Sequence, residues 1–297
     1  MDQSNPNNDE INVIELLKVL RQNANKLVYI VIFFAISSVI YSFFQPEIWR
    51  SSTILEVSTK ISGGGSSSGG GIQLAGIKLK DDKSDSSKAL TLITSRDLVT
   101  KIIDNNQDVL GYLLAFDGYD SFRKKDNVNS NKFDSENNIW IGEKPSFSSI
   151  YQAYLGTISV NLNKGNGFIY LSASHKSPIF AEKMLDIVIK ELNDFARQRD
   201  LDEANKSLDY LYGKLDETFQ DNVKLSISSL IEAQLKKQTL AKVKQDYLVE
   251  PLDSPFLPEE RYSPNRRQIL TYGILIGLIL GIIYILMRYY LKKNKVL

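Results

Sequence analysis

Two long apolar blocks, one near each end, constrain this chain more than any other feature. The first is LVYIVIFFAISSVIYSFF at Leu27–Phe44, the second is ILTYGILIGLILGIIYIL at Ile269–Leu286, and neither contains a charged residue. A helix of this length measures about 27 Å, close to the hydrocarbon thickness of a bilayer. Buried helices of soluble proteins seldom stay apolar on every face for so long. We therefore expect transmembrane helices at 27–44 and 269–286.

A cleavable signal peptide is the alternative interpretation of the first block. Ala35-Ile36-Ser37 has the small-x-small pattern of a cleavage site. This tripeptide lies inside the apolar run, however, and the segment before the run is long and partly acidic, unlike the start of a signal peptide. The sequence favours a retained membrane anchor.

The basic residues predict the orientation of both helices. Three precede the first block and four follow the second: Lys18, Arg21 and Lys26, then Arg288, Lys292, Lys293 and Lys295. By the positive-inside rule, we expect residues 1–26 and 287–297 in the cytoplasm and 45–268 outside the membrane. Three arginines outside the second block oppose this assignment (Arg261, Arg266 and Arg267), but two spans must return the chain to its starting side. Because both cytoplasmic segments are short, we expect the function in the outer segment or the membrane.

Composition excludes several kinds of site. Lys and Arg total 36 against 35 Asp and Glu, so nothing suggests a nucleic-acid partner. Without Cys and with one His, His175, the chain has no thiolate or multi-histidine metal site. We interpret His175 as a solvated or cap-adjacent residue, and Asp202 with Lys206 as an ion-paired helix face. We assign no catalytic, metal or cofactor residue, although a carboxylate pair from distant positions stays open.

The outer segment begins with features of a small sheet. Residues 47–59 are rich in β-branched and aromatic residues, which predicts a strand. Asn166-Gly167 lies between two alternating runs at 157–163 and 168–174, which predicts a hairpin. We expect these three strands to form a membrane-proximal sheet. The Gly/Ser run at 63–71 predicts a flexible linker, because no lysine follows it as a phosphate-binding loop requires.

Helices account for most of the remaining outer segment. Apolar spacing in 85–104 predicts one or two amphipathic helices, whereas 105–144 is polar and we expect irregular or weakly helical structure there. Ser177 is a candidate N-cap and Pro178 suits the first helical position. Little then interrupts a helix before Pro251, so a continuous helix would extend ~100 Å, with a bend near Gly213 or Asp221-Asn222. Such a helix needs partner helices from its own chain or from another copy.

Two further patterns concern the second apolar block and the segment before it. Four prolines in 251–264 favour a stiff, extended connector: Pro251, Pro255, Pro258 and Pro264. Glycine recurs every fourth residue in the block, which lets another helix approach closely, and small residues form a comparable stripe in the first block. The glycines are Gly273, Gly277 and Gly281, and the stripe is Ala35, Ser38 and Ser42. We expect these residues to pack the spans together, within one chain or between copies.

The order of these features resembles that of the chain length determinant proteins, polysaccharide co-polymerases that regulate O-antigen length. The resemblance covers INVIELLKVL at 11–20, WRSSTILEV at 49–57, SRDL at 95–98 and the strand-to-helix segment 168–195. The proline-rich connector and the glycine-bearing second span are its most specific mark. The sequence given contains neither the Walker loop nor the tyrosine-rich tail of relatives with a fused tyrosine kinase.

The resemblance implies an α+β membrane protein of the bacterial inner membrane, with a small membrane-proximal sheet and a long helix in the periplasm. It implies a ring-like homo-oligomer without enzymatic activity or cofactors, acting with the O-antigen polymerase on lipid-linked polysaccharide. The glycines would serve assembly or polymerase contact, and the prolines would couple the outer domain to the span. Two alternatives stay open: a capsule or exopolysaccharide co-polymerase with a separate tyrosine kinase, and a membrane-anchored periplasmic hydrolase.

Overall fold

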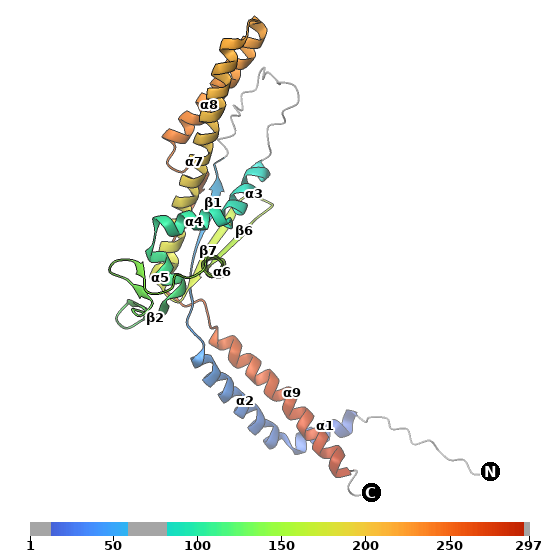
Figure 1. Cartoon of the computed structure of the whole chain (residues 1–297). Helices are drawn as coiled ribbons and strands as arrows, with labels where there is room; N and C mark the ends of the chain where they lie inside the picture. The colour runs from blue at the N-terminus through green and yellow to red at the C-terminus, as the bar shows by residue number, and fades with distance from the viewer. Residues whose placement is uncertain (1–12, 59–81, 294–297) are drawn as a thin grey trace, which may run out of the picture. The chain divides into compact units, whose positions relative to one another are not determined.

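The computed structural model describes residues 13–58 and 82–293. The predicted Gly/Ser linker at 63–71 therefore lies outside the described residues, as do both ends of the chain. The chain forms two compact units, the first from residues 1–47 and 262–297 and the second from 48–261. Figure 1 shows the chain coloured from end to end.

The described residues of the first unit form mainly helices. They are α1 (Val13–Gln22), α2 (Ala24–Phe44) and α9 (Arg266–Lys293). By length and hydropathy, Ala24–Phe44 and Arg266–Leu291 could each cross a membrane. The side chains support this property, because both helices expose large apolar residues such as Phe33 and Ile279 rather than burying them within the chain. An apolar surface of this size needs lipid or protein to cover it.

The second unit is built on a four-stranded antiparallel sheet with the order β6-β7-β1-β8. The strands are β1 (Trp49–Val57), β6 (Ile158–Leu162), β7 (Ile169–His175) and β8 (Val249–Pro251). Trp49 pairs with His175 and Leu55 with Ile169, so β7 lies along β1 over the whole length of β7. The predicted strand and hairpin are confirmed. Strand β8, which pairs with the other edge of β1, is an addition that sequence analysis missed.

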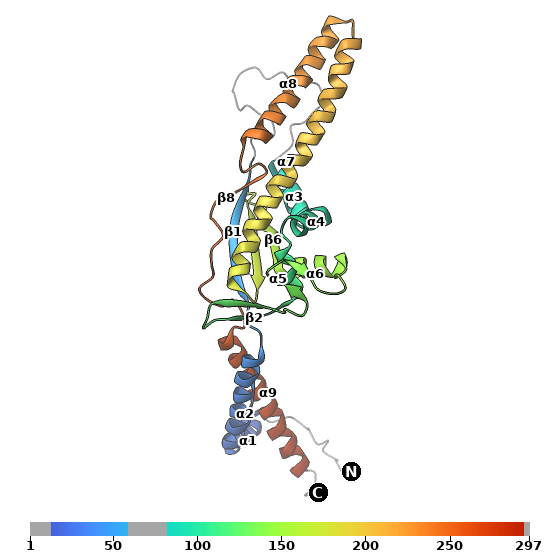
Figure 2. The same cartoon turned by 60° about the vertical axis from the view of Figure 1, so that its left-hand side comes forward.

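Five helices surround one apolar core together with this sheet (Figure 2). They are α3 (Asp82–Ile93), α4 (Arg96–Asn105), α5 (Asp108–Leu114), α6 (Phe147–Thr157) and the first half of α7 (Pro178–Glu217). The predicted amphipathic helices in 85–104 are thus confirmed as α3 and α4, separated by the N-cap Ser95. Tyr154 is fully buried, and its hydroxyl donates to the carbonyl of Ile93 at 2.8 Å, which joins α6 to the end of α3.

The prediction for 105–144 was wrong in part. Besides α5, this segment forms two small hairpins, β2 (Phe116–Asp120) with β3 (Lys125–Val128) and β4 (Phe133–Asp134) with β5 (Ile139–Trp140). Local polar chemistry stabilises them, because aspartate side chains accept hydrogen bonds from the backbone of each turn. Gly111 also allows Phe133 to pack onto α5, since a Cβ there would lie 2.5 Å from Phe133 Cδ1.

The predicted long helix folds back on itself. Ser177 caps α7 by accepting from the Phe180 amide at 3.0 Å, and Pro178 occupies its first turn, as the sequence predicts. The helix ends at Glu217, however, and α8 (Asp221–Val243) packs back against it as an antiparallel hairpin (Figure 2). Thr218 and Gln220 both have extended backbone conformations that end one helix and begin the next. The apolar stripe of α7 therefore finds a partner within its own chain.

Side chains on α7 fix the end of α8 and the strand that follows it. Arg197 donates to the carbonyls of Lys244 at 3.1 Å and Gln245 at 2.6 Å, where α8 ends. The buried Asn193 accepts from the amides of Leu248 and Val249 at 2.8 and 2.9 Å and donates to the Val249 carbonyl at 2.9 Å. One amide group thus satisfies three backbone groups and holds β8 at the edge of the sheet.

Replacing Asn193 should weaken the outer unit selectively. We expect Asn193→Ala to lower the free energy of unfolding by about 2–3 kcal/mol, because it leaves buried backbone groups without partners. The fluorescence of Trp49 and Trp140, both in this unit, reports its thermal unfolding in the full chain in detergent. Asn205→Ala on the same helix is the matched control and should change little, because the hydrogen bond that Asn205 accepts from Gln238 at 2.7 Å is exposed to solvent. Equal effects of the two substitutions would contradict the role of Asn193 in holding β8.

Candidate functional site: the helix pair, the connector and a histidine pocket

The glycine stripe of α9 faces α2. A Cβ on Gly277 would lie 2.9 Å from Phe34 Cβ and 3.1 Å from Val31 Cα, and one on Gly281 would lie 2.6 Å from Leu27 Cδ1. At Gly273 a Cβ would meet the Ser38 side chain. Contacts move toward the start of α2 as α9 proceeds, so the helices are antiparallel. Because these glycines have no side chains, the backbones of α2 and α9 lie close together within this chain.

The stripe of small residues on α2 has three different environments. Ser38 lies against Gly273, and its hydroxyl donates to the carbonyl of Ala35 at 2.8 Å. Ala35 itself is partly buried. Ser42 is buried, and its hydroxyl has no hydrogen-bond partner among the described residues. The predicted stripe therefore meets the glycines directly at Ser38, and its role in assembly stays a prediction.

One arginine that opposes the predicted orientation is locally compensated. Arg266, at the start of α9, lies 3.2 Å from the Glu47 carboxylate. Its guanidinium also stands over the Phe43 ring at 4.5 Å from the centroid. A paired arginine stacked on an aromatic ring suits the boundary between apolar and polar surroundings. Arg266 thus links the last turn of α2 to the first turn of α9.

The proline-rich connector begins as part of the sheet. Pro251 ends β8, and the Leu252 amide donates to the carbonyl of Ile54 at 2.8 Å. Further along, Thr53 donates to the carbonyl of Asp253 at 2.6 Å and Ser51 to that of Phe256 at 2.7 Å. The connector therefore runs antiparallel along β1 for several residues. Two buried β1 hydroxyls hold it where prolines interrupt the backbone hydrogen bonds.

The four prolines are not equivalent. Pro251 and Pro255 are half-buried, in the segment that runs alongside β1. Pro258 is buried within the outer unit, and Pro264 is buried within the helical unit, two residues before α9 begins. Their proposed role in coupling stays a prediction. The segment is nevertheless extended, as the prolines indicate.

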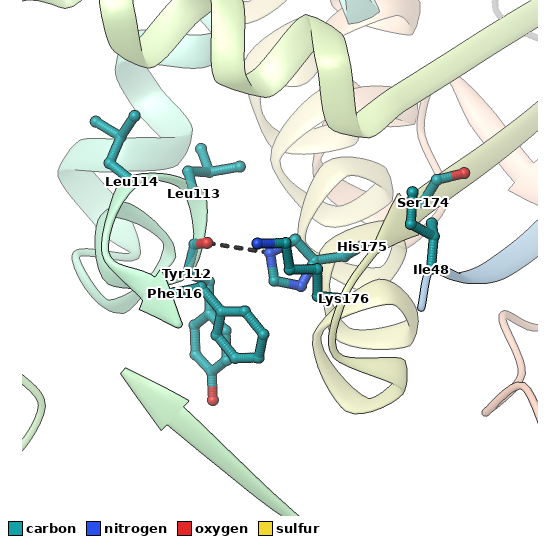
Figure 3. A pocket seen from close by; sticks show the side chains of 8 residues that line it. All are labelled: Ile48, Tyr112, Leu113, Leu114, Phe116, Ser174, His175 and Lys176. Carbon is teal, nitrogen blue, oxygen red and sulfur yellow. Dashed lines mark hydrogen bonds between the residues drawn. The ribbon is translucent and has the colours of Figure 1, made fainter. Parts of the chain in front are cut away.

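His175 is not the solvated residue that we considered first; it lies beside a helix cap. Its Nδ1 accepts from the Ser177 amide at 3.0 Å, so Nε2 carries the proton and donates to the Tyr112 carbonyl at 3.1 Å (Figure 3). The ring contacts Phe116 and Phe180, with centroids 4.7 and 4.6 Å away. A pocket of about 250 Å³ opens beside it, lined by the rings of Tyr112, Phe116 and His175 and by Ile48, Leu113, Leu114, Ser174 and Lys176.

The surroundings of His175 keep its ring neutral. Burial lowers its pKa from 6.5 to about 4, and the nearby Lys176 adds to this effect, while the Tyr112 carbonyl opposes it. Sequence analysis missed these contacts, since they depend on Tyr112 and Phe116 in a segment whose structure the pattern did not reveal. In the sequence, only the alternation Ala173-Ser174-His175 at the end of a predicted strand indicated on which side of the sheet His175 would lie. A neutral, fully hydrogen-bonded imidazole acts here as a structural link between β7, α5 and α7.

The acidic side chains of α7 form ion pairs and hydrogen bonds with α8 and the residues that follow it. Asp200 accepts from Tyr247 at 2.7 Å and lies 3.3 Å from Lys237, while Glu203 lies 3.1 Å from the same lysine. Within 13–58 and 82–293, no group of His, Asp or Glu side chains could hold a metal ion. These carboxylates tie α7 to α8, and the prediction that Asp202 pairs with Lys206 is replaced by a contact of Asp202 with Gln198 at 2.9 Å.

Comparison with known families finds a similarity in the first third of the chain. Residues 9–106 match the family model described as chain length determinant protein (Wzz). This match confirms the resemblance to the chain length determinant family. It covers about a third of the chain, including α1, α2, β1, α3 and α4.

Solved structures and curated proteins were compared as well. A solved structure described as a full-length bacterial polysaccharide co-polymerase aligns with 95% of this chain and 99% of its own, at 14% identity and a TM-score of 0.41. No curated protein matches the chain.

A larger side chain at Gly277 should disturb the helix pair. We expect Gly277→Leu to lower stability by about 1–3 kcal/mol, because the new atoms overlap Phe34 and Val31. The onset temperature of heat-induced aggregation of the full chain in detergent measures the effect. Gly213→Leu is the matched control, since a Cβ at that exposed position of α7 meets nothing within 4 Å. An unchanged onset for Gly277→Leu would refute close packing of α2 and α9.

The depressed pKa of His175 predicts how stability depends on pH. The unfolded chain binds a proton near pH 6.5 and the folded chain only near pH 4, so acid favours unfolding between these values. The contribution is fully present above pH 6.5, falls as pH decreases, and is lost at about pH 4, a change of about 3 kcal/mol. Thermal unfolding of the wild type should therefore have a steeper pH dependence than that of His175→Gln. Identical slopes would contradict a neutral buried ring.

Proposed function

We propose that this protein regulates the length of lipopolysaccharide O-antigen chains as a non-enzymatic co-polymerase in the bacterial inner membrane. The observation that carries the proposal is the family match over residues 9–106, which includes the first candidate membrane span and the strand that follows it. A regulator of this kind biases where elongation by the repeat-unit polymerase stops and transfers no sugar itself.

The proposed topology places both termini in the cytoplasm and the outer unit, residues 48–261, in the periplasm. The candidate spans flank this unit in the sequence, at Ala24–Phe44 and Arg266–Leu291. The basic residues at the far ends of both helices support this orientation. With this topology, the long helical hairpin lies on the side of the membrane where O-antigen repeats are joined.

The proposed working form is a homo-oligomer, and the surface of the hairpin supports it. Although α7 and α8 cover each other on one side, both leave large apolar residues exposed: Tyr210, Leu225, Leu230, Leu235 and Val243. Isolated exposed apolar residues are ordinary, but a series along one hairpin favours contact with another protein surface. Copies of the same hairpin, arranged around an axis, would cover this series.

The main alternative is a co-polymerase for capsule or exopolysaccharide that works with a separate tyrosine kinase. The same family match accommodates both functions, so the polymer is the distinguishing property. Neighbouring genes discriminate between them, since a separate kinase supports the alternative, whereas an O-antigen polymerase and ligase support our proposal.

Deletion of the gene tests the proposal. We expect polysaccharide synthesis to continue while the preferred chain length disappears, because the regulator biases termination and is not needed for polymerisation. A gel ladder of lipopolysaccharide, with and without the protein, measures the length distribution. A ladder that kept its modal cluster after deletion, or lost all long chains, would overturn the proposal. Complementation with the wild-type gene should restore the cluster, and this serves as the control.

A further inference from the structure

The turn between β2 and β3 presents an unusual combination of side chains. Phe122 is completely exposed, and it is followed by Arg123, Lys124 and Lys125, all exposed as well. Exposing a whole phenylalanine ring to water is unfavourable relative to burying it. A partner that contacts apolar and cationic groups together would remove this cost.

The turn holds Phe122 in this position. The Asp120 carboxylate accepts from the amides of Phe122 at 3.0 Å and Arg123 at 3.1 Å. Lys124 has a positive φ of 49°, as a tight reversal requires. Asp120 and Lys125 are then opposite each other as backbone partners in the two strands. The exposed ring therefore stands on a hydrogen-bonded turn between paired strands.

The charges of this hairpin are separated. Its acidic side chains are engaged by neighbouring groups: Asp126 accepts from the Tyr112 hydroxyl at 3.1 Å, Asp117 from the Asn129 amide at 3.4 Å, and Asp120 from the turn itself. The three cations are consecutive in the sequence, Arg123 lies 3.9 Å from the Asp120 carboxylate, and Lys125 is the strand partner of the same aspartate. Although the hairpin has no net charge, its turn presents a positive surface beside an apolar ring.

The segment that joins α2 to β1 is short. Trp49 of β1 makes an edge-to-face contact with Tyr119 of β2, with centroids 6.2 Å apart. Trp49 follows Phe44, the last residue of α2, by only a few residues, which span at most ~18 Å when extended. If α2 crosses the membrane, as we propose above, the hairpin cannot lie far from the bilayer surface.

We propose that the β2–β3 turn docks on the outer surface of the membrane that α2 crosses, with Phe122 inserted among the lipid headgroups. Arg123, Lys124 and Lys125 would then contact anionic headgroups, each contributing roughly a fivefold factor in attraction to an anionic surface. Trp49 and Tyr119 belong to the residue types that favour this interface. The partner is the lipid itself, and docking would fix the base of the outer unit against the bilayer.

Fluorescence quenching tests this inference in the intact chain. Because the protein has no cysteine, Phe122→Cys can be labelled specifically with an environment-sensitive dye and reconstituted into phosphatidylcholine nanodiscs with or without phosphatidylglycerol. Lipids with a spin label near the headgroup should quench this dye several-fold more than a dye at Phe219→Cys. Phe219 is the matched control, an exposed phenylalanine at the turn between α7 and α8.

A third label separates this inference from the proposed topology. A dye at Leu280→Cys, within α9, should be quenched by spin labels deep in the acyl chains. Quenching at position 280 without quenching at 122 would overturn the docking and leave the membrane anchoring intact. No quenching at 280 would overturn the anchoring and the docking together.

Two further outcomes identify what the turn contacts. The double substitution Lys124→Ser, Lys125→Ser should reduce quenching at position 122 in discs that contain phosphatidylglycerol. The expected value is close to that in discs of phosphatidylcholine alone. Unreduced quenching would refute the role of the cations. A blue shift at 122 that spin-labelled lipid does not quench, and that disappears in discs holding a single chain, would show contact with a second copy and overturn the lipid assignment.

Discussion

Pairing along strand β1 is the interaction on which the outer unit depends. This strand follows α2 after a few residues and pairs with β7 on one edge and with β8 on the other. Strand β8 leads into the connector, which continues along β1 through Thr53 and Ser51 before the chain enters α9. The segments that lead from and to the two candidate spans are therefore neighbours in one sheet. A change at either edge of β1 would affect both.

Sequence reasoning succeeded where a local pattern determines the structure. The uncharged blocks, the Asn166-Gly167 turn and the Ser177-Pro178 helix start each depend on a few adjacent residues, and each is found in the structure. The glycine repeat indicated a face for close packing, and α2 covers that face in this chain. Whether the partner would come from the same chain could not be predicted, because the repeat describes one helix alone.

Other features could not be predicted because distant residues create them. Strand β8 has three residues and depends on Asn193, more than fifty positions earlier, for its hydrogen bonds. The β2–β3 and β4–β5 hairpins lie in polar sequence without alternation, where aspartate side chains and the Gly111–Phe133 contact determine the path. His175 is kept neutral by burial beside Phe116 and Phe180, which no spacing in the sequence associates with it.

The helical hairpin also has a consequence for how such proteins can vary. Its two helices are fastened at one end by Arg197 and Asn193, while the reversal at 218–220 makes no contribution to the core of the sheet. Adding matched turns to both helices near the reversal would lengthen the arm by about 5 Å per turn and leave the fastened end unchanged. The length of the hairpin can therefore change by insertion while the sheet and the helices packed on it stay the same.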